Sequence, residues 1–545
     1  MKIEKLNLTH PLHLILVLFT FQHSLQANAK RSLTDPDASI QLTSPMPRQI
    51  NQRTQTSDGV FAVSGTLTYQ NVDGYIVVTV MDHKSHKSVL TQRTDLPAAN
   101  PEALDRPFNL DVKVSAGWYD LKTTFFTRSD DAKITESSVS QVGIGEVFLV
   151  AGQSNAANHG SVQLTPKDER VSAFNSDTGT WQFAADPQPV ASRWGWGGGS
   201  PWPEFGDQLV KALKVPVGII NVAWGGSSVH EWERGVVMDG SSHAIGLQPT
   251  PLLRELYPRL QKVVQALPKN GIRALLWHQG ETDALIGTPE KQYRDSILNI
   301  MNQVNQDAGY KLPWVIAQAT AIWFPDALIP ESTRQSVRNA QSFLWSPNGP
   351  AFKGPDTDTL ALVDAEHGAS IAACDKTYRA PDCTHMNGEG LMKHGGLWAT
   401  SVLTAFFDPN SKPPETPIVT PPSNEISVSV DGKPLKLSTA PYMSKQGSVM
   451  VPMRAIFEAL GAGVKWEGTT QTITATQKLS DGTDDVVVSL TLDKNSALVD
   501  GQAVTLSQAA VLSGGSTFVP LRFVAESLGA SVEWNKTTFH VSITR

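Results

Sequence analysis

The sequence has little cysteine, a modest share of charge and no long apolar run after its first thirty residues. Cys374 and Cys383 are the only cysteines among 545 residues, too few for a disulfide scaffold. They can form one bridge that pins the loop between them, or remain two buried thiols. Charged residues make up 18% of the chain, and the net charge is −7. The scattered lysines and arginines form no basic stripe, so we expect no nucleic-acid partner. No later apolar run is long enough to cross a bilayer, so we expect no membrane span in the mature protein.

The N-terminus has the pattern of a secretory signal. Lys2 and Lys5 precede an apolar stretch over residues 14–21, and Ala27-Asn28-Ala29 forms a small-x-small cleavage site. A membrane anchor is the alternative, but spanning a bilayer takes about 20 apolar residues, and this stretch is much shorter. We expect cleavage near Ala29 and a protein that is secreted or associated with the cell surface.

The chain is long enough for about three folded units. Over residues 60–142, apolar and polar residues alternate in short runs between turn signals, which predicts a small β-sandwich. Apolar runs then alternate with helix-like stretches such as 205–213 and 288–305, which predicts an α/β fold with a parallel sheet between helices. The apolar runs expected as strands are 147–150, 217–222, 274–277, 313–317 and 360–363.

A proline-rich spacer over residues 409–424 separates the α/β unit from a repeat. Residues 451–466 return in similar form as residues 519–534, and each copy predicts a short helix followed by a strand. The expected organisation is a signal peptide (1–29), a β-sandwich-like domain (30–145), an α/β domain (146–408), a linker (409–424) and an α+β repeat domain (425–545).

Ser154 follows the apolar run 147–150 directly, in Ala151-Gly152-Gln153-Ser154-Asn155. Ligands of parallel sheets bind at the carboxyl ends of the strands, so this hydroxyl lies where a nucleophile is expected. Gly152 permits a sharp turn, and the Ser154 amide can donate to a substrate oxyanion. A serine in this position can also be a simple helix N-cap, so the case depends on its partners.

Two more strand ends offer donors for negative charge. Gly225 and Gly226 follow the run 217–222, and their amides can bind an oxyanion or only form a tight turn. Gln279 follows the run 274–277, and its side chain can supply a further hydrogen bond. We interpret its neighbours His278 and Glu281 as a polar pair that braces the loop.

A serine nucleophile needs a general base that is oriented by a carboxylate. Two stretches offer Asp-x-x-His, namely Asp364 with His367 and Asp382 with His385. The second pair is preferred because it lies after the last expected strand, in a loop that leads into a helix. The first pair is expected to shape its own loop.

The blocks Gly152-Gln-Ser-Asn155, Trp277-His-Gln-Gly-Glu281 and Asp382-x-x-His385 resemble those of the SGNH hydrolase superfamily. They are most similar to the sialate O-acetylesterase and acetylxylan esterase group, carbohydrate esterase family 6. The resemblance implies a three-layer α/β/α domain, with Ser154 as nucleophile, His385 as base and Asp382 as its orienting carboxylate. It implies an oxyanion hole made by Ser154, Gly225 or Gly226, and Gln279.

This resemblance implies a serine esterase that removes acetyl groups from carbohydrate without metal or cofactor. The sugar is expected to contact Asn155 and a platform of Trp194, Trp196 and Trp202, although any of these indoles can equally belong to the core. The substrate could be sialate, xylan or peptidoglycan O-acetyl groups. A surface protein that binds carbohydrate or cell wall without catalysis is the alternative, against which the intact Ser154, Asp382 and His385 argue.

The C-terminal repeat resembles the copper amine oxidase N-terminal-like, or stalk, domain. Copper is not expected, because after residue 425 the only histidine is His540 and there is no cysteine. We expect a noncatalytic module that attaches the protein to cell wall or polysaccharide, with a simple spacer as the alternative.

Overall fold

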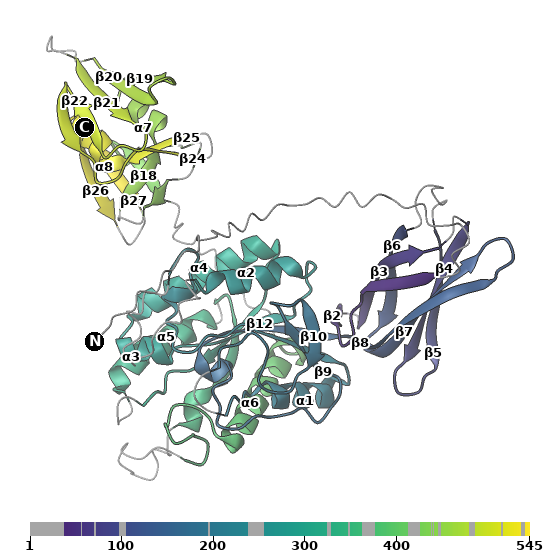
Figure 1. Cartoon of the computed structure of the whole chain (residues 1–545). Helices are drawn as coiled ribbons and strands as arrows, with labels where there is room; N and C mark the ends of the chain where they lie inside the picture. Colours follow the sequence, from purple (N-terminus) through teal and green to yellow (C-terminus); the bar gives the residue numbers. More distant parts are fainter. Residues whose placement is uncertain are drawn as a thin grey trace, which may run out of the picture.

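The computed structural model shows a β domain, an α/β domain and a C-terminal domain (Figure 1). It describes residues 38–545 apart from 56, 70–71, 97–104, 194–196, 238–254, 324–328, 347–348, 362–375, 412–425, 436, 438, 440, 445–447, 479–484, 514–515 and 536–539. The predicted signal peptide, most of the linker and the pair Asp364 and His367 lie outside these residues. Within them, no helix combines the length and apolar character needed to cross a membrane.

The β domain is a sandwich of antiparallel strands. One sheet contains β1 (Ser39–Ser44), β3 (Asp58–Thr68) and β6 (Asp105–Ser115); the other contains β4 (Gly74–Asp82), β5 (Ser88–Asp95), β7 (Gly117–Thr127) and the first part of β8 (Lys133–Gly152). Alternate residues of β6 are buried, as expected for a strand with one face toward the core. Phe61, Val78 and Leu121 are among the fully buried side chains of this core.

Strand β8 belongs to both the β domain and the α/β domain. It pairs with β7 over its first part and with β11 (Val217–Asn221) and β12 (Ala274–His278) over its last part. The short strand β2 (Ile50–Gln52) pairs with it between the two. The predicted boundary between residues 145 and 146 therefore falls inside one continuous strand.

The α/β domain has the strand order β10-β9-β11-β8-β12-β13-β14. Its further strands are β9 (Val171–Asn175), β10 (Thr180–Phe183), β13 (Trp314–Gln318) and β14 (Phe352–Asp356). Neighbouring strands are parallel except for β10, which is antiparallel to β9. The predicted α/β class is confirmed.

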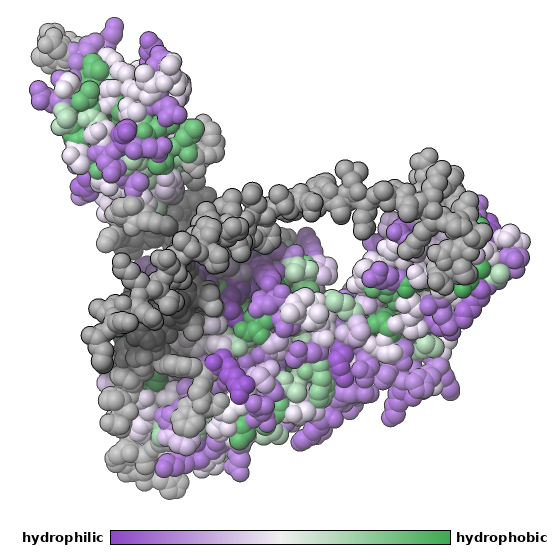
Figure 2. All heavy atoms as spheres, in the orientation of Figure 1, coloured by the Kyte–Doolittle hydropathy of each residue, from purple (hydrophilic) through white to green (hydrophobic). Residues whose placement is uncertain are grey.

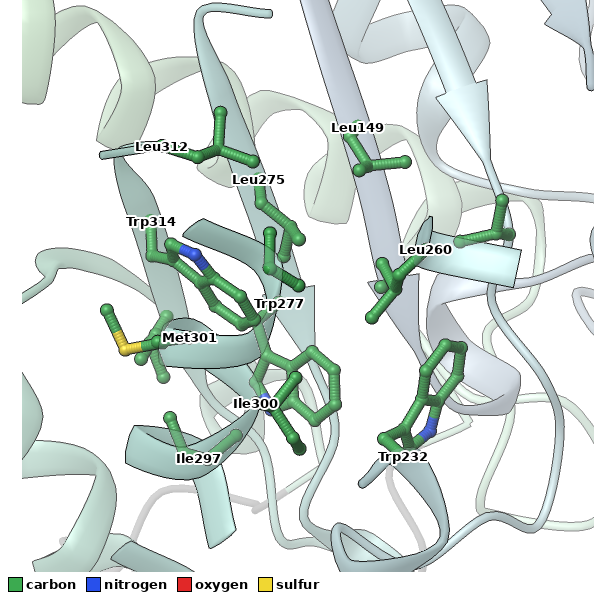
Figure 3. Close-up of a cluster of buried hydrophobic side chains, with 14 of the residues drawn as sticks. Leu149, Trp232, Leu260, Leu275, Trp277, Ile297, Ile300, Met301, Leu312 and Trp314 are labelled. Carbon is green, nitrogen blue, oxygen red and sulfur yellow. The ribbon is translucent and has the colours of Figure 1, made fainter. Parts of the chain in front are cut away.

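Helices cover both faces of this sheet because successive strand residues point to opposite sides. On one face, α1 (Trp202–Leu213) and α6 (Gly388–Phe407) pack on Phe148 and Val150. On the other face, α2 (Tyr257–Ala266), α4 (Glu290–Ala308) and α5 (Glu331–Leu344) pack on Leu149. Figure 3 shows part of this second core, where Trp277 and Trp314 lie among aliphatic side chains. Figure 2 shows hydrophilic residues over much of the visible outer surface.

The prediction of a strand over residues 360–363 is wrong at its start. Leu360 ends the short 3-10 helix η3 (Thr357–Leu360), and β14 is the strand that pairs with β13. The Asp356 side chain accepts a hydrogen bond from the Asp358 amide and so begins the helical turn. Strand β14 was not predicted because its sequence FKGPD contains glycine and proline, which are uncommon in strands. The strand lies at the edge of the sheet, where both residues are tolerated.

In the C-terminal domain the two repeats pair with each other. Strand β18 (Val449–Pro452) leads into α7 (Met453–Ala459) and β19 (Ala462–Glu467), while β25 (Ser516–Pro520) leads into α8 (Leu521–Ser527) and β26 (Ser531–Asn535). Val451 faces Val519 in the antiparallel pair β18–β25, and both are buried. The other strands are β15 (Ser427–Val430), β16 (Lys433–Pro434), β17 (Tyr442–Met443), β20 (Thr472–Gln477), β21 (Val486–Thr491), β22 (Ser496–Val499), β23 (Gln502–Thr505), β24 (Val511–Ser513) and β27 (His540–Thr544).

Candidate active site

Ser154 lies at the carboxyl end of the central strand β8. It begins the 3-10 turn η1 (Ser154–Ala156) and is 6% exposed. The turn depends on Gly152, which has φ +131°; a Cβ there would lie 1.9 Å from the carbonyl oxygen of His278. The Gln153 amide donates to that same oxygen at 2.9 Å. The β8–β12 pairing therefore continues to the turn and holds the nucleophile candidate at the sheet edge.

Asp382 and His385 form a tight pair in the loop before α6. Nδ1 of His385 lies 2.6 Å from Oδ2 of Asp382. Oδ1 of Asp382 accepts hydrogen bonds from the amides of Thr384 at 3.0 Å and His385 at 2.9 Å. Burial raises the pKa of Asp382, but the hydrogen bond and charge of His385 outweigh it and hold the value at about 2. The carboxylate is therefore ionised at neutral pH and holds the imidazole by Nδ1.

This arrangement leaves Nε2 of His385 as the ring nitrogen that is free to accept a proton. A neutral imidazole that donates from Nδ1 keeps Nε2 as an acceptor. Nε2 is buried and has no hydrogen-bond partner among the described residues, so it is not bonded to the Ser154 hydroxyl in this conformation. Such contacts of catalytic groups commonly tighten only when substrate is bound.

Asn155 connects the turn over residues 154–156 (the nucleophile turn) to the loop over residues 382–385 (the base loop). Its side-chain nitrogen donates to Oε1 of Glu281 at 2.9 Å and to the backbone oxygen of Thr384 at 3.2 Å. The amide nitrogen is committed to these protein acceptors. The structure thus gives Asn155 a bridging position.

The predicted oxyanion donors differ in their availability. The first amides of a helical turn have no partner within it, which suits the Ser154 amide that begins η1. The Gly225 amide donates to Oγ of Ser192 at 2.7 Å, and Gly226 adopts φ +73° in the adjoining turn. A Cβ built on Gly225 would lie 3.5 Å from Cβ of Ser154, which brings the glycine turn beside Ser154.

Gln279 is not free to donate to a substrate in this conformation, which corrects the expectation from sequence. Its side chain is fully buried, and Nε2 contacts the oxygens of Gln153 at 3.2 Å and Ser227 at 3.0 Å as well as the carboxylate of Asp283. Two amide hydrogens already face three protein acceptors. Gln279 therefore braces the loop behind the nucleophile.

Comparison with known families finds matches for two parts of the chain. Residues 144–403 match the family described as carbohydrate esterase, sialic acid-specific acetylesterase. This part of the chain is similar to that family. The match confirms the resemblance found in the blocks around Ser154, Gln279 and His385. Residues 429–543 match the copper amine oxidase N-terminal domain.

Individual relatives of the esterase domain are distant. A probable carbohydrate esterase of Arabidopsis thaliana is 25% identical over 190 residues, 31% of this chain, and the chain spans 66% of its length. A carbohydrate acetylesterase from Xanthomonas citri has a TM-score of 0.39 at 17% identity, covering 89% of this chain and 91% of its own. A solved Arabidopsis thaliana protein has a TM-score of 0.36 at 21% identity, covering 48% of this chain and 98% of its own.

Behind the site, the esterase domain buries a histidine pair. Nδ1 of His278 lies 3.1 Å from Nε2 of His394, and Nε2 of His278 lies 3.4 Å from Oε1 of Glu281. Burial raises the pKa of Glu281, but its contacts with His278 and Asn155 lower it overall. His278 and Glu281 therefore lie in a buried polar network that reaches the nucleophile turn through Asn155.

Three residues of the site were missed by sequence reasoning: His159, Ser192 and His394. His159 contacts His385 and Ser192, which in turn contacts Gly225. His159 follows Ser154 by five residues, and this closeness was the available signal. Nothing in the local sequence marked Ser192 or His394.

The esterase domain does not use Trp202 as a sugar platform, so that prediction is wrong. Its indole is fully buried in α1, and its Nε1 donates to the backbone oxygen of Ala156 at 2.7 Å. Trp194 and Trp196 lie outside the described residues. Cys383 is disulfide-bonded, and Cys374, the other cysteine of the chain, lies outside the described part.

The described residues contain no group of three or more His, Cys, Asp or Glu that could hold a metal ion. In the C-terminal domain, both ring nitrogens of His540 lie 2.8 Å from serine hydroxyls, those of Ser427 and Ser429. No other histidine and no cysteine follows residue 425. The donor set of this domain therefore does not fit copper, despite the name of its family.

Proposed function

We propose that the protein is a secreted carbohydrate O-acetylesterase in which Ser154 is the nucleophile, His385 the general base and Asp382 its orienting carboxylate. The observation that carries the proposal is the Asp382–His385 pair at 2.6 Å, which leaves Nε2 buried and without a partner among the described residues. The family of the domain and the position of Ser154 at the sheet edge support the same reaction.

The proposed reaction is acyl transfer in two steps. Oγ of Ser154 attacks the acetyl carbonyl while Nε2 of His385 takes its proton, and that proton then passes to the leaving sugar oxygen. Water, deprotonated by His385, attacks the acetyl-enzyme and releases acetate as Ser154 regains its proton. The amides of Ser154 and Gly226 are the proposed stabilisers of the oxyanion, because the Gly225 amide already donates to Oγ of Ser192.

The finer substrate assignment is an ester of sialate or xylan. The family description, which names sialic acid, favours the former. Export is proposed from Lys2, Lys5 and the apolar stretch before Ala29. We also propose that the C-terminal domain attaches the enzyme to wall polysaccharide. Sedimentation with cell walls should then be lost when the chain ends at residue 411.

The deciding experiment measures acetate release from O-acetylated sialic acid, acetylated xylan and O-acetylated peptidoglycan. The mature protein is compared with Ser154→Ala and with Ser129→Ala, a control serine exposed in the β domain. Release by the mature protein and Ser129→Ala alone is expected, and the preferred polymer identifies the substrate class. Equal release by Ser154→Ala would refute the nucleophile, while binding without release from any polymer would indicate a noncatalytic protein.

A further inference from the structure

His159 is a buried imidazole that touches both halves of the proposed catalytic apparatus. It is 4% exposed, and its ring stacks on that of His385 with centroids 5.3 Å apart and planes 28° apart. Its edge lies against the glycine turn: a Cβ built on Gly225 would lie 2.7 Å from both Cε1 and Nε2 of His159. One ring therefore contacts the general base and the backbone beside the nucleophile.

A serine hydroxyl extends this contact to the Gly225 peptide. Nε2 of His159 lies 3.1 Å from Oγ of Ser192, and the same oxygen accepts the Gly225 amide at 2.7 Å. A hydroxyl that accepts one hydrogen bond still has its own hydrogen to donate. The arrangement thus assigns the donor order Gly225 to Ser192 to His159, with the ring hydrogen of His159 on Nδ1.

The backbone of Ser192 is held as well. Its amide donates to the oxygen of Ala223 at 3.0 Å, and its own oxygen accepts the Asn158 amide at 3.0 Å. Asn158 directly precedes His159, so the ring and the hydroxyl are fixed by one set of backbone contacts. This anchoring lets the side-chain contact set the orientation of the Gly225 peptide.

The environment keeps His159 neutral while the neighbouring His385 gains and loses a proton in the proposed reaction. Burial lowers the pKa of His159 to about 3; the positive charge of His385 acts in the same direction, and the carboxylate of Asp382 opposes it. The ring therefore adds no cation beside His385 when that residue takes a proton from Ser154. The face of a neutral aromatic ring is instead a favourable neighbour for a cation.

We infer that His159 and Ser192 are a positioning pair that fixes the His385 ring and the Gly225 peptide relative to each other. The inference rests on the proposed esterase function. A ring that only filled space would also stack on His385, but its contact with Ser192 would then have no kinetic effect. The two possibilities are separated by removing the ring nitrogen and the hydroxyl independently.

The experiment compares kcat and KM for 4-nitrophenyl acetate in His159→Phe, Ser192→Ala and the double variant. His159→Phe keeps an aromatic ring but removes Nε2, and Ser192→Ala removes its partner. Each is expected to lower kcat about 10-fold with little change in KM, since misplacement of a reacting group slows the chemical step. The double variant should be no slower than either single one, because both remove the same interaction.

Two further variants sharpen the comparison. His159→Gln, which keeps a polar atom near the position of Nε2, should recover most of kcat. His86→Phe makes the same change at a histidine whose side chain is 74% exposed in the β domain, and it should leave kcat unchanged. The pH profile of kcat/KM should change in His159→Phe and not in His86→Phe, because only the first residue adjoins His385.

The rate of Ser154 labelling by a fluorophosphonate gives a readout that does not depend on the acyl substrate. Normal kcat and labelling in the single variants, or losses that add in the double variant, would overturn the inference while Ser154→Ala still tests the function. A loss of kcat matched by the fraction of unfolded protein would also overturn it. A wild-type protein that neither hydrolyses nor labels would overturn both.

Discussion

The side-chain nitrogen of Asn155 links Glu281 and Thr384, donating to Oε1 of the first at 2.9 Å and to the backbone oxygen of the second at 3.2 Å. The guanidinium of Arg379 donates to the same Thr384 oxygen. Thr384 directly precedes His385, so these two donors set where the base loop lies relative to the nucleophile turn. The position of the base is thus coupled to the residue next to Ser154.

The first prediction concerns this link. Asn155→Ala should lower the unfolding free energy by about 1–3 kcal/mol, because the buried carboxylate of Glu281 loses a donor. It should also lower kcat by up to about 100-fold, because the base loop loses one of its two clamps. Urea unfolding and acetate release measure the two effects. Asn109→Ala, at an exposed position of β6, is the control that should change neither, and an equal loss there would contradict the role of Asn155.

The second prediction concerns catalysis by the Asp382–His385 pair. Asp382→Asn keeps an oxygen for the amides of Thr384 and His385 but presents a donor to Nδ1, which favours the wrong tautomer of the imidazole. If the proposed mechanism holds, kcat should fall roughly 10³–10⁴-fold, the loss seen when a serine hydrolase loses this carboxylate. A variant with near-normal kcat would show that the Asp382 carboxylate does not orient the base.

The same pair predicts how stability depends on pH. The pKa of Asp382 is lowered from 3.8 to about 2 in the folded protein, so its ionised form stabilises the fold above about pH 4. This contribution is lost as the pH falls through about 2. After allowance for solvent screening, wild type should exceed Asp382→Asn by about 1–2 kcal/mol at pH 7. Urea unfolding from pH 7 to pH 2 should show the difference shrinking, and a constant difference would contradict this account.

The fourth prediction concerns the turn that presents Ser154. Gly152→Ala should destabilise the protein by roughly 2–5 kcal/mol and abolish activity, because its φ of +131° and the oxygen of His278 leave no room for Cβ. Gly235→Ala is the matched control, with φ +78° and no atom within 4 Å of its Cβ. It should cost only about 1–2 kcal/mol from its backbone conformation. Denaturant unfolding compares the two, and equal costs would rule out the clash with His278.

The fifth prediction concerns the junction of the β and esterase domains. Glu146, fully buried in β8, accepts hydrogen bonds from Arg53 and Arg273, each at 2.6 Å. Glu146→Leu should cost about 3–5 kcal/mol because it leaves both guanidiniums without their shared carboxylate. Glu136→Leu removes an exposed carboxylate near Lys133 and should cost less than about 1 kcal/mol. Calorimetry measures both, and similar small losses would show that the junction does not depend on Glu146.

Periodicity and strand ends predicted much of the site from the sequence. The carboxyl ends of parallel strands share one edge of a sheet, so the residues after runs 147–150, 217–222 and 274–277 were expected together. The structure brings Ser154 and Gly225 to this edge, with His385 contacting the same cluster through His159. The fold class followed from alternating strand and helix patterns, which depend on local burial.

The errors lie where a side chain's role depends on distant partners. The sequence suggests Trp202 as part of a sugar platform, but α1 buries this side chain against Ala156. The sequence suggests Gln279 as a donor to the substrate oxyanion, but Gln153 and Asp283 already accept the hydrogens of its side chain. Sequence shows the residue type at such positions and not which acceptors the fold brings within 3 Å.

The sequence alone determined the order of domains, the α/β class and the candidate residues Ser154, Asp382 and His385, because these depend on local patterns and short motifs. Only the tertiary structure decided that His159 and Ser192 join the base to the glycine turn and that β8 runs through two domains. Those relations arise when segments far apart in the chain are packed together, and hydrogen-bond partners follow from that packing and not from spacing along the chain.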